Sequence, residues 1–410
     1  MTGGVLFGLL LILGGSALGV PIVILLGAVT LMIEAVHAVW RRAGLRDVRY
    51  VRRLEGRRVA WGDELLMTIE VWNRRWLPLP WLRADDEAPF GVTVRERELT
   101  DSKERGTDVL RNAWTLRPWE RVVRRFHVVT DRRGVFRIGP VELAIGDPFA
   151  SQVADELRPD TATFLAWPRT LPTTEIEPPD RWGDLDRARL SLTEDPSRFA
   201  GVRPYAPGDP RRRIHAKTSA RLGTPVTKRF ESSRERQVLI ALDVQTIDGA
   251  AWEAGDGGDE VESLYVVAAS IARTLGTRRV AFGLMAAGFS GAESRFAIVP
   301  VSADPGQAGR VLDLLARLSG HASASFERLL LLVRRSVGPG TTVLVLSARD
   351  TRPFASALRG LERAGAEVVV VACGDAAPDR VEAARASGFT ARRAWMDGHW
   401  RTAERLVIAP

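Results

Sequence analysis

The chain of 410 residues contains very little cysteine and very little lysine. Its one cysteine, Cys373, excludes an intrachain disulfide and a zinc site built on cysteines, so a reducing compartment is allowed. Only Lys103, Lys217 and Lys228 are lysines among 58 basic residues, so arginine carries the net charge of +8. Two interpretations of the arginine bias stay open: contact with phosphate or anionic lipid, or a codon-driven preference without a function.

Motifs of the common enzyme classes are also missing. The sequence has no GxxxxGK[ST] phosphate loop, no GxGxxG after a strand and no HExxH pair. Its five histidines do not have the spacing of metal ligands, and the lone His215 in a basic loop is interpreted as structural or solvated. GFSG at Gly288–Gly291 lacks the spacing of a nucleophile elbow. We therefore predict that the protein is not an enzyme and name no catalytic residue.

The N-terminal stretch is strongly apolar. Between Val5 and Trp40 only Glu34 and His37 are ionisable, which is too long an apolar run for a signal peptide. A single crossing of a membrane needs about 20 residues. We predict a transmembrane hairpin of two helices over residues 1–42, with a tight turn near Gly19. One long tilted helix is the alternative.

Arginines follow this stretch directly. Residues 41–58 contain eight arginines against Asp47 and Glu55. By the positive-inside tendency this end stays in the cytoplasm, and a hairpin then leaves the bulk of the chain there. The predicted localisation is the cell membrane, with two crossings. Glu34 and His37 lie one helical turn apart and are interpreted as residues near the cytoplasmic interface, with a proton or ion relay as the alternative.

Two further regions precede the C-terminal half. Residues 43–153 contain short alternating segments separated by turn signals, which predicts a small β-sandwich. Residues 154–196 have weak signals, one strand at Ala162–Ala166 and several prolines, and are predicted to be a linker. From residue 237 to 410, apolar runs alternate with helical patterns, which predicts an α/β domain with a doubly wound, mostly parallel sheet.

A basic segment over residues 197–236 leads into this α/β domain. It has a turn signal at Pro207–Pro210 and ten arginines or lysines between Arg203 and Arg236. The first strand of the domain, from Gln237, ends in Asp243 at the edge of the sheet where ligands bind. We select these residues as candidates for binding a partner or an anion: Arg203, Asp209, Arg211, Arg212, Arg213, Lys217 and Arg221.

The string RFAGVRPYAPGDPRRRIHAKTSAR, followed by a strand that ends in Asp, resembles the signature of the DUF58 family. GVFRIGPVELAIGDPFA, residues 134–150, and the two-helix anchor resemble the same family. The resemblance implies a membrane-anchored bacterial protein whose C-terminal part is like a von Willebrand factor A domain. It also implies an adhesion or assembly module, often associated with MoxR-type AAA+ ATPases, and no known enzyme activity. The signature usually has Trp where this chain has Ala216.

The metal motif that this resemblance implies is incomplete. Metal-binding domains of this type present Asp-x-Ser-x-Ser after the first strand, whereas this chain has Asp243, Gln245 and Thr246 in a DVQTI string. After a later strand, Ser347-Ala348 stands where Ser-Asp is expected. One carboxylate is a poor half-shell for Mg²⁺, so we predict a degenerate remnant and no cofactor. A residual Mg²⁺ site through Asp243, Thr246 and Asp350 stays open as the alternative.

These observations lead to one predicted function and one alternative. The predicted function is a non-enzymatic, membrane-anchored protein-interaction module that works with a MoxR-type AAA+ ATPase in assembly or in envelope-related processes. The alternative is binding of anionic lipid or nucleic acid through the arginine-rich segment, with nucleic acid the less favoured of the two. No small-molecule substrate is identified.

Overall fold

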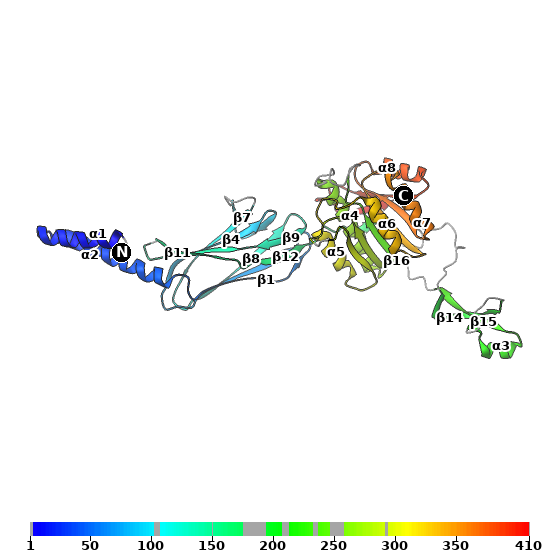
Figure 1. Ribbon diagram of the computed structural model, residues 1–410, viewed down its shortest axis with the longest axis horizontal. Coiled ribbons are helices and arrows are strands. Elements are labelled where there is room, and N and C mark those ends of the chain that lie inside the picture. The colour runs from blue at the N-terminus through cyan, green and yellow to red at the C-terminus, as the bar shows by residue number, and fades with distance from the viewer. Residues whose placement is uncertain are drawn as a thin grey trace. The chain divides into compact units, whose positions relative to one another are not determined.

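The computed structural model describes residues 3–101, 107–149, 151–174, 194–206, 213–232, 237–246, 258–291 and 294–409. The chain divides into two compact units, Met1–Trp167 and Pro168–Pro410. The first unit consists of a helix pair and mostly antiparallel sheets, and the second contains a mixed sheet with helices (Figure 1).

Two apolar helices begin the first unit. α1 (Gly3–Leu18) and α2 (Pro21–Ala43) lie side by side, and the chain reverses at Gly19, whose φ of 65° is left-handed (Figure 1). Gly8 and Gly27 face each other so closely that a Cβ on Gly27 would lie 2.7 Å from the Gly8 carbonyl oxygen. Small residues therefore let the two backbones approach, as in helix pairs that pack in lipid.

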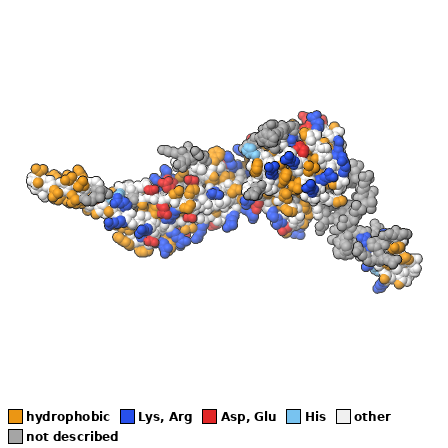
Figure 2. All heavy atoms as spheres, in the orientation of Figure 1, with side chains coloured by type: hydrophobic (Ala, Val, Ile, Leu, Met, Phe, Trp, Pro, Cys, Tyr) orange, Lys and Arg blue, Asp and Glu red, His pale blue; other side chains and the backbone are white. Residues whose placement is uncertain are grey.

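One helix of the pair is long enough and apolar enough to cross a membrane. α2 has 23 residues and a mean hydropathy of 2.3, whereas α1 has 16 residues. Hydrophobic side chains cover the visible face of the pair (Figure 2). The prediction of an apolar N-terminal segment is confirmed for one helix that could cross a membrane. That the chain crosses the membrane twice stays a prediction.

Two antiparallel sheets of the first unit share one core. The first has the order β1-β3-β8-β5, the second the order β11-β10-β4-β7-β6, and a smaller third sheet has the order β2-β12-β9. Met67 and Ile69 of β3 and Leu82 and Ala84 of β4 are fully buried in the shared core. This is the organisation of a β-sandwich. The strands are β1 (Val48–Leu54), β2 (Arg58–Val59), β3 (Leu65–Asn73), β4 (Leu79–Pro89), β5 (Val92–Val94), β6 (Thr100–Asp101), β7 (Thr107–Leu116), β8 (Arg121–Thr130), β9 (Gly134–Ile138), β10 (Val141–Gly146), β11 (Gln152–Arg158) and β12 (Ala162–Ala166).

The second unit is built on an eight-stranded mixed sheet. Its order is β13-β22-β21-β20-β19-β16-β17-β18, and the strands β21-β20-β19-β16-β17 are parallel. β18 is antiparallel to β17 and β22 is antiparallel to β21, whereas β13 is parallel to β22. The strands are β13 (Thr173–Thr174), β16 (Gln237–Leu242), β17 (Ala281–Ala286), β18 (Ala297–Ser302), β19 (Thr341–Ser347), β20 (Glu367–Ala372), β21 (Thr390–Met396) and β22 (Leu406–Ala409).

Helices cover this sheet, and its central strands are buried on both faces. One core joins β16 and β19 to α6, α7 and α8, through residues such as Val345, Leu329 and Leu361. The alternate residues of the same strands are buried as well, as expected for parallel strands between two helical layers. The helices are α4 (Gly258–Thr277), α5 (Gln307–Arg317), α6 (Phe326–Ser336), η2 (Arg352–Phe354), α7 (Ala355–Arg363) and α8 (Ala377–Ala386).

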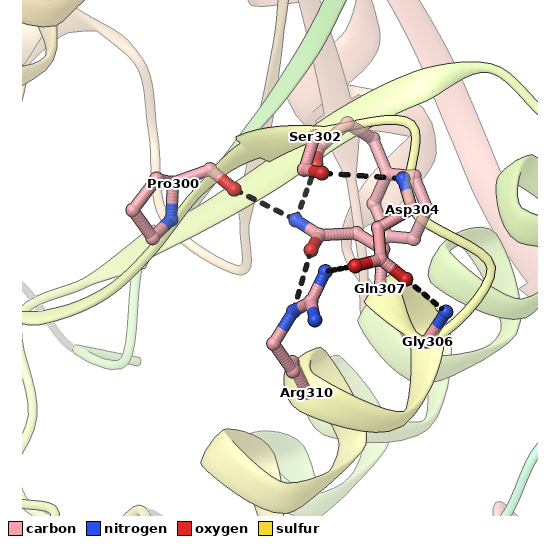
Figure 3. A network of polar contacts seen from close by, with 7 residues as sticks. Pro300, Ser302, Asp304, Gly306, Gln307 and Arg310 are labelled. Atoms are coloured by element: carbon pink, nitrogen blue, oxygen red, sulfur yellow. Dashed lines mark hydrogen bonds and ion pairs between the residues drawn. The ribbon is translucent and has the colours of Figure 1, made fainter.

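The side chain of a buried glutamine forms hydrogen bonds that stabilise the edge strand β18 in this sheet. Gln307, the first residue of α5, donates from Nε2 to the carbonyl oxygens of Phe282 at 2.6 Å and Pro300 at 2.7 Å (Figure 3). The pairing of β17 with β18 shifts register at Phe282, and the side-chain amide supplies donors there. Arg310 donates to Gln307 Oε1 at 2.9 Å and pairs with Asp304 at 3.1 Å, which fixes the amide orientation.

Residues of the predicted linker contribute to sheets of both units. β11 begins before residue 154 and pairs with β10, whereas β13 pairs with β22 in the mixed sheet. The sequence pattern also missed β21 and β22, which widen the mixed sheet beyond the predicted strands. Residues 175–193 lie outside the described part of the chain.

Candidate functional site

Asp243 and Arg349 meet at the carboxyl end of the parallel strands. Asp243 directly follows β16, and Arg349 comes two residues after the end of β19, the neighbouring strand. Arg349 Nε donates to Asp243 Oδ2 at 2.9 Å, and the two side chains are 3% and 1% exposed. The parallel pairing thus brings an acid and a base that are 106 residues apart into one buried ion pair.

Asp243 is held by further donors. Ser347 Oγ donates to Asp243 Oδ2 at 2.9 Å, and the backbone N–H of Gln245 donates to Oδ1 at 3.2 Å. Burial raises the pKa of Asp243 to about 6, and the Arg349 guanidinium and these hydrogen bonds offset part of that rise. The guanidinium also lies 5.6 Å from the centroid of the Phe354 ring. The pair is therefore fixed from several sides.

The residues at this edge do not fit a divalent cation. Arg349 already places a positive charge against the one carboxylate, and hard cations need several convergent oxygens. The carboxylate of Asp350 accepts instead from Arg352, at 2.8 Å from both its backbone N and its Nε. Gln245 and Thr246 are buried. Within the ranges that the structure describes, no three His, Cys, Asp or Glu side chains gather into a metal-ligand group.

Arg349 is a residue of this site to which the sequence pattern assigned no role. The predicted remnant consisted of Asp243, Gln245, Thr246 and Asp350, and the structure joins Asp243 to Arg349 and Ser347. The Ser-x-Arg string at the end of the Thr341–Ser347 strand was the available signal. It was interpreted only as the loss of an expected aspartate.

The basic segment forms a hairpin with a short helix. β14 (Glu194–Pro204) pairs with β15 (Val226–Ser232), and α3 (Ala216–Leu222) lies between them in the sequence (Figure 1). His215 caps α3, since its Nδ1 accepts from the backbone N of Thr218 at 3.2 Å. Its own backbone N donates to the Val226 oxygen at 2.9 Å. His215 is therefore structural here, as the sequence interpretation held.

Two of the predicted binding residues share one side of α3. Lys217 and Arg221 are exposed and lie four residues apart, so their side chains are neighbours on the helix surface. Arg203 on β14 is exposed, and its NH1 donates to the Pro204 oxygen at 3.2 Å, while Arg213 is half-buried ahead of α3. Three candidates lie outside the described residues: Asp209, Arg211 and Arg212.

The polar end of α2 contacts the loop between β10 and β11. His37 Nδ1 lies 3.0 Å from Asp147 Oδ2, and Asp147 is fully buried. The other oxygen, Oδ1, accepts from the backbone N–H groups of Phe149 and Ser151, both at 3.0 Å. Asp147 belongs to the GDPF string that carries part of the family resemblance, so this string builds the acceptor for the helix.

Two more hydrogen bonds join the same helix end to the loop between β3 and β4. Trp40 Nε1 donates to the Pro78 oxygen at 3.1 Å, and Arg75 NH1 donates to the Gly44 oxygen at 2.6 Å. The Gly44 backbone N in turn donates to the Trp40 oxygen at 2.9 Å and ends the helix. Hydrogen bonds to two loops of the first unit thus hold the C-terminal end of α2.

The single cysteine lies at the end of β20. Cys373 is 1% exposed, and burial raises the pKa of its thiol to about 12. Its backbone N donates to the Ser347 oxygen at 3.0 Å, which ties it to the strand that leads to Arg349. A neutral, buried thiol of this kind is a poor nucleophile.

Residues 201–372 match the model of the family described as "Protein of unknown function DUF58". This region of the chain is therefore similar to the DUF58 family. The DUF58 match covers the basic segment from residue 201 onward, β16 with Asp243, and β19 with Arg349. No curated protein matches the chain.

Several solved structures resemble a minor part of the chain. The CARDB domain of the PF1109 protein from Pyrococcus furiosus is 17% identical with a TM-score of 0.19, over 29% of this chain and 91% of that one. The sporulation control protein Spo0M from Bacillus subtilis is 14% identical with a TM-score of 0.19, over 29% of this chain and 49% of that one. A cohesin module from Clostridium perfringens is 9% identical with a TM-score of 0.20, over 29% of this chain and 97% of that one. Likenesses this weak carry no argument.

Proposed function

We propose that the protein is a membrane-anchored interaction module. In this proposal α1 and α2 enter the membrane as a hairpin, and the remaining chain lies in the cytoplasm. The observation that carries the proposal is a set of hydrogen bonds that joins the C-terminal end of α2 to loops of the β-sandwich through His37, Trp40 and Gly44. An apolar helix bound rigidly to a folded domain suits an anchor, because the domain is then held at the membrane surface. The arginines that follow α2 support a cytoplasmic placement.

The α/β part of this proposal is a doubly wound domain like a von Willebrand factor A domain. Its support is the run of five parallel strands with Asp243 at their carboxyl end, together with the DUF58 match. In this chain the acid is neutralised by Arg349, so the domain would act without a metal ion. In this proposal the domain works by binding a partner and not by catalysis.

The partner we propose is a MoxR-type AAA+ ATPase, in an assembly or envelope-related process. This follows from the resemblance to DUF58 proteins and from an exposed basic surface, Lys217 and Arg221 on α3. Two cations on one helix side suit an acidic surface of a partner protein. The hairpin that carries them is small, so the contact would depend strongly on these two charges.

Crosslinking from native membranes tests this proposal. We expect the wild type to capture an ATPase subunit and the double variant Lys217→Glu, Arg221→Glu to lose it. A matched control reverses two exposed arginines four residues apart on α7, Arg359 and Arg363. An Asp243→Ala variant distinguishes the basic surface of α3 from the sheet edge. Loss of the partner only in that variant would show that the partner binds at the sheet edge. Capture of no ATPase by the wild type contradicts the proposal.

Binding of an anionic polymer or lipid by the basic hairpin is the second candidate. The observation that favours it is the same pair of exposed cations, Lys217 and Arg221. Counterion release makes such binding steeply salt-dependent, so affinity should fall strongly between low and moderate ionic strength. Titration of the full chain in detergent with a short single-stranded DNA and with phosphatidylglycerol micelles tests this. Binding that does not change with salt would exclude it.

A further inference from the structure

A hollow lined by arginines lies where α2 meets the β-strands. It has a volume of about 550 Å³, which is within the usual range for small-ligand sites. The last turn of α2, the turn after it and β11 together form its walls. Its lining includes four arginines and two acids: Arg41, Arg42, Arg46, Arg158, Asp47 and Glu156. We call this hollow the junction pocket.

The two acids of the junction pocket already have basic neighbours. Glu156 pairs with Arg158, with Nε and Oε1 3.3 Å apart. Burial lowers the pKa of Arg75, and the nearby negative charge of Asp47 offsets part of that lowering. Arg41, Arg42 and Arg46 are exposed, and none of the three forms an ion pair with a residue that the structure describes. The pocket therefore has an excess of positive charge.

The turn that forms the junction pocket is fixed in shape. Gly44 and Asp47 have left-handed φ values of 50° and 56°, and Leu45 between them is buried. The backbone N of Arg74 donates to the Asp47 oxygen at 2.9 Å, and Arg75 donates to the Gly44 oxygen. The arginines thus extend from a preorganised turn, so little backbone ordering opposes the binding of a ligand.

We infer that the junction pocket binds the phosphate of an anionic phospholipid headgroup. The inference rests on the proposed membrane anchoring, because α2 then leaves the lipid at Trp40 and places the pocket at headgroup depth. Basic residues next to a membrane-crossing helix attract anionic lipid, and arginine binds phosphate in a bidentate geometry. The helix C-terminus itself repels anions, so the attraction depends on the arginines. Figure 2 shows basic side chains gathered where the helices give way to the strands.

Lipid exchange in nanodiscs tests the inference. The full chain is placed in nanodiscs of equal parts phosphatidylcholine and phosphatidylglycerol, and the lipid retained after delipidation is identified by native mass spectrometry. We expect selective retention of phosphatidylglycerol by the wild type. The triple variant Arg41→Gln, Arg42→Gln, Arg46→Gln should bind roughly a hundredfold more weakly, at about fivefold for each arginine.

The matched control removes three exposed arginines of the same unit outside the pocket: Arg49→Gln, Arg53→Gln and Arg125→Gln. This control should retain phosphatidylglycerol as the wild type does. Equal loss in both variants would overturn the inference, because net charge alone would then explain the retention. Retention by the pocket variant would overturn it as well.

Two further arms separate the sources of phosphate and the two proposals. Calorimetry with inorganic phosphate on the detergent-solubilised wild type tests for a free-anion site. Phosphate binding without selective lipid retention would overturn the lipid assignment. Extraction of membranes with alkaline carbonate tests the anchor. Release of the wild type by carbonate contradicts the proposed function. A wild type that stays in the membrane but does not retain phosphatidylglycerol in the nanodisc experiment contradicts only this inference. Circular dichroism checks that the variants are folded.

Discussion

Arg349 Nε lies 2.9 Å from Asp243 Oδ2 in a site where both side chains are almost fully buried. A buried guanidinium and a buried carboxylate each depend on the other, because either one alone would be an uncompensated charge. Ser347 supports the same carboxylate oxygen. The two side chains therefore neutralise each other inside the protein, at the carboxyl ends of β16 and β19.

Removal of the arginine should destabilise the sheet strongly. We expect Arg349→Ala to lower the free energy of unfolding of the α/β unit by about 3 to 5 kcal/mol, since it leaves Asp243 buried without its counter-ion. Hydrogen exchange of amides in β16 and β19 measures this locally. The matched control is Arg352→Ala, which removes an exposed pair with Asp350 and should cost at most about 1 kcal/mol. Equal effects of the two variants would contradict the buried role.

The stability of this unit should depend on the ionisation of Asp243. The folded pKa is about 6 against 3.8 for an unperturbed aspartate, so between these pH values the folded chain holds a proton that the unfolded chain has released. The stabilising contribution is fully present below about pH 4 and is lost as the pH rises through about 6. The stability difference between wild type and Asp243→Asn should therefore fall by roughly 3 kcal/mol from pH 4 to pH 7. A constant difference would contradict the raised pKa.

Magnesium should have no effect on the wild type. Because Arg349 occupies the position beside the one carboxylate, added Mg²⁺ should leave the thermal midpoint of unfolding of the full chain unchanged. Differential scanning fluorimetry with and without Mg²⁺, with Ca²⁺ as a second probe, checks this. A midpoint that rises with Mg²⁺ in the wild type but not in Asp243→Ala would restore the metal-site alternative.

The amide of Gln307 should matter for the edge of the mixed sheet. We expect Gln307→Leu to cost about 2 kcal/mol, because two buried carbonyl oxygens, of Phe282 and Pro300, lose their donor. Exchange of amides in β17 and β18 should rise more than exchange in β20. Asp304→Ala, which breaks the outer ion pair of the same network, should have a smaller effect (Figure 3).

The strong apolar runs of the α/β unit were predictable, and the pairing of its side chains was not. The expected strand from Gln237 to Asp243 corresponds closely to β16, because it is a clear apolar run. β21 was missed, since its TARRAWM string carries two arginines and is buried at only two of its seven positions. Such a pattern does not separate a strand from a loop.

The candidate site shows the same limit. Asp243 could be placed at the ligand edge because it ends an apolar run, but its partner is 106 residues away and is fixed by the register of β16 on β19. The contact of His37 with Asp147 depends likewise on how a helix end and a distant loop pack. No local pattern encodes either pair. The DUF58 resemblance located the basic segment, which the family match over residues 201–372 supports.

The burial of Cys373 makes the chain well suited to site-directed labelling. A thiol with a pKa of about 12 that is 1% exposed should stay silent toward maleimides at neutral pH while the protein is folded. A single new cysteine in place of Lys217, Arg221 or Arg46 would then be the one reactive position. Spectroscopic probes or photocrosslinkers could be attached there in the otherwise native sequence, without first removing a background thiol.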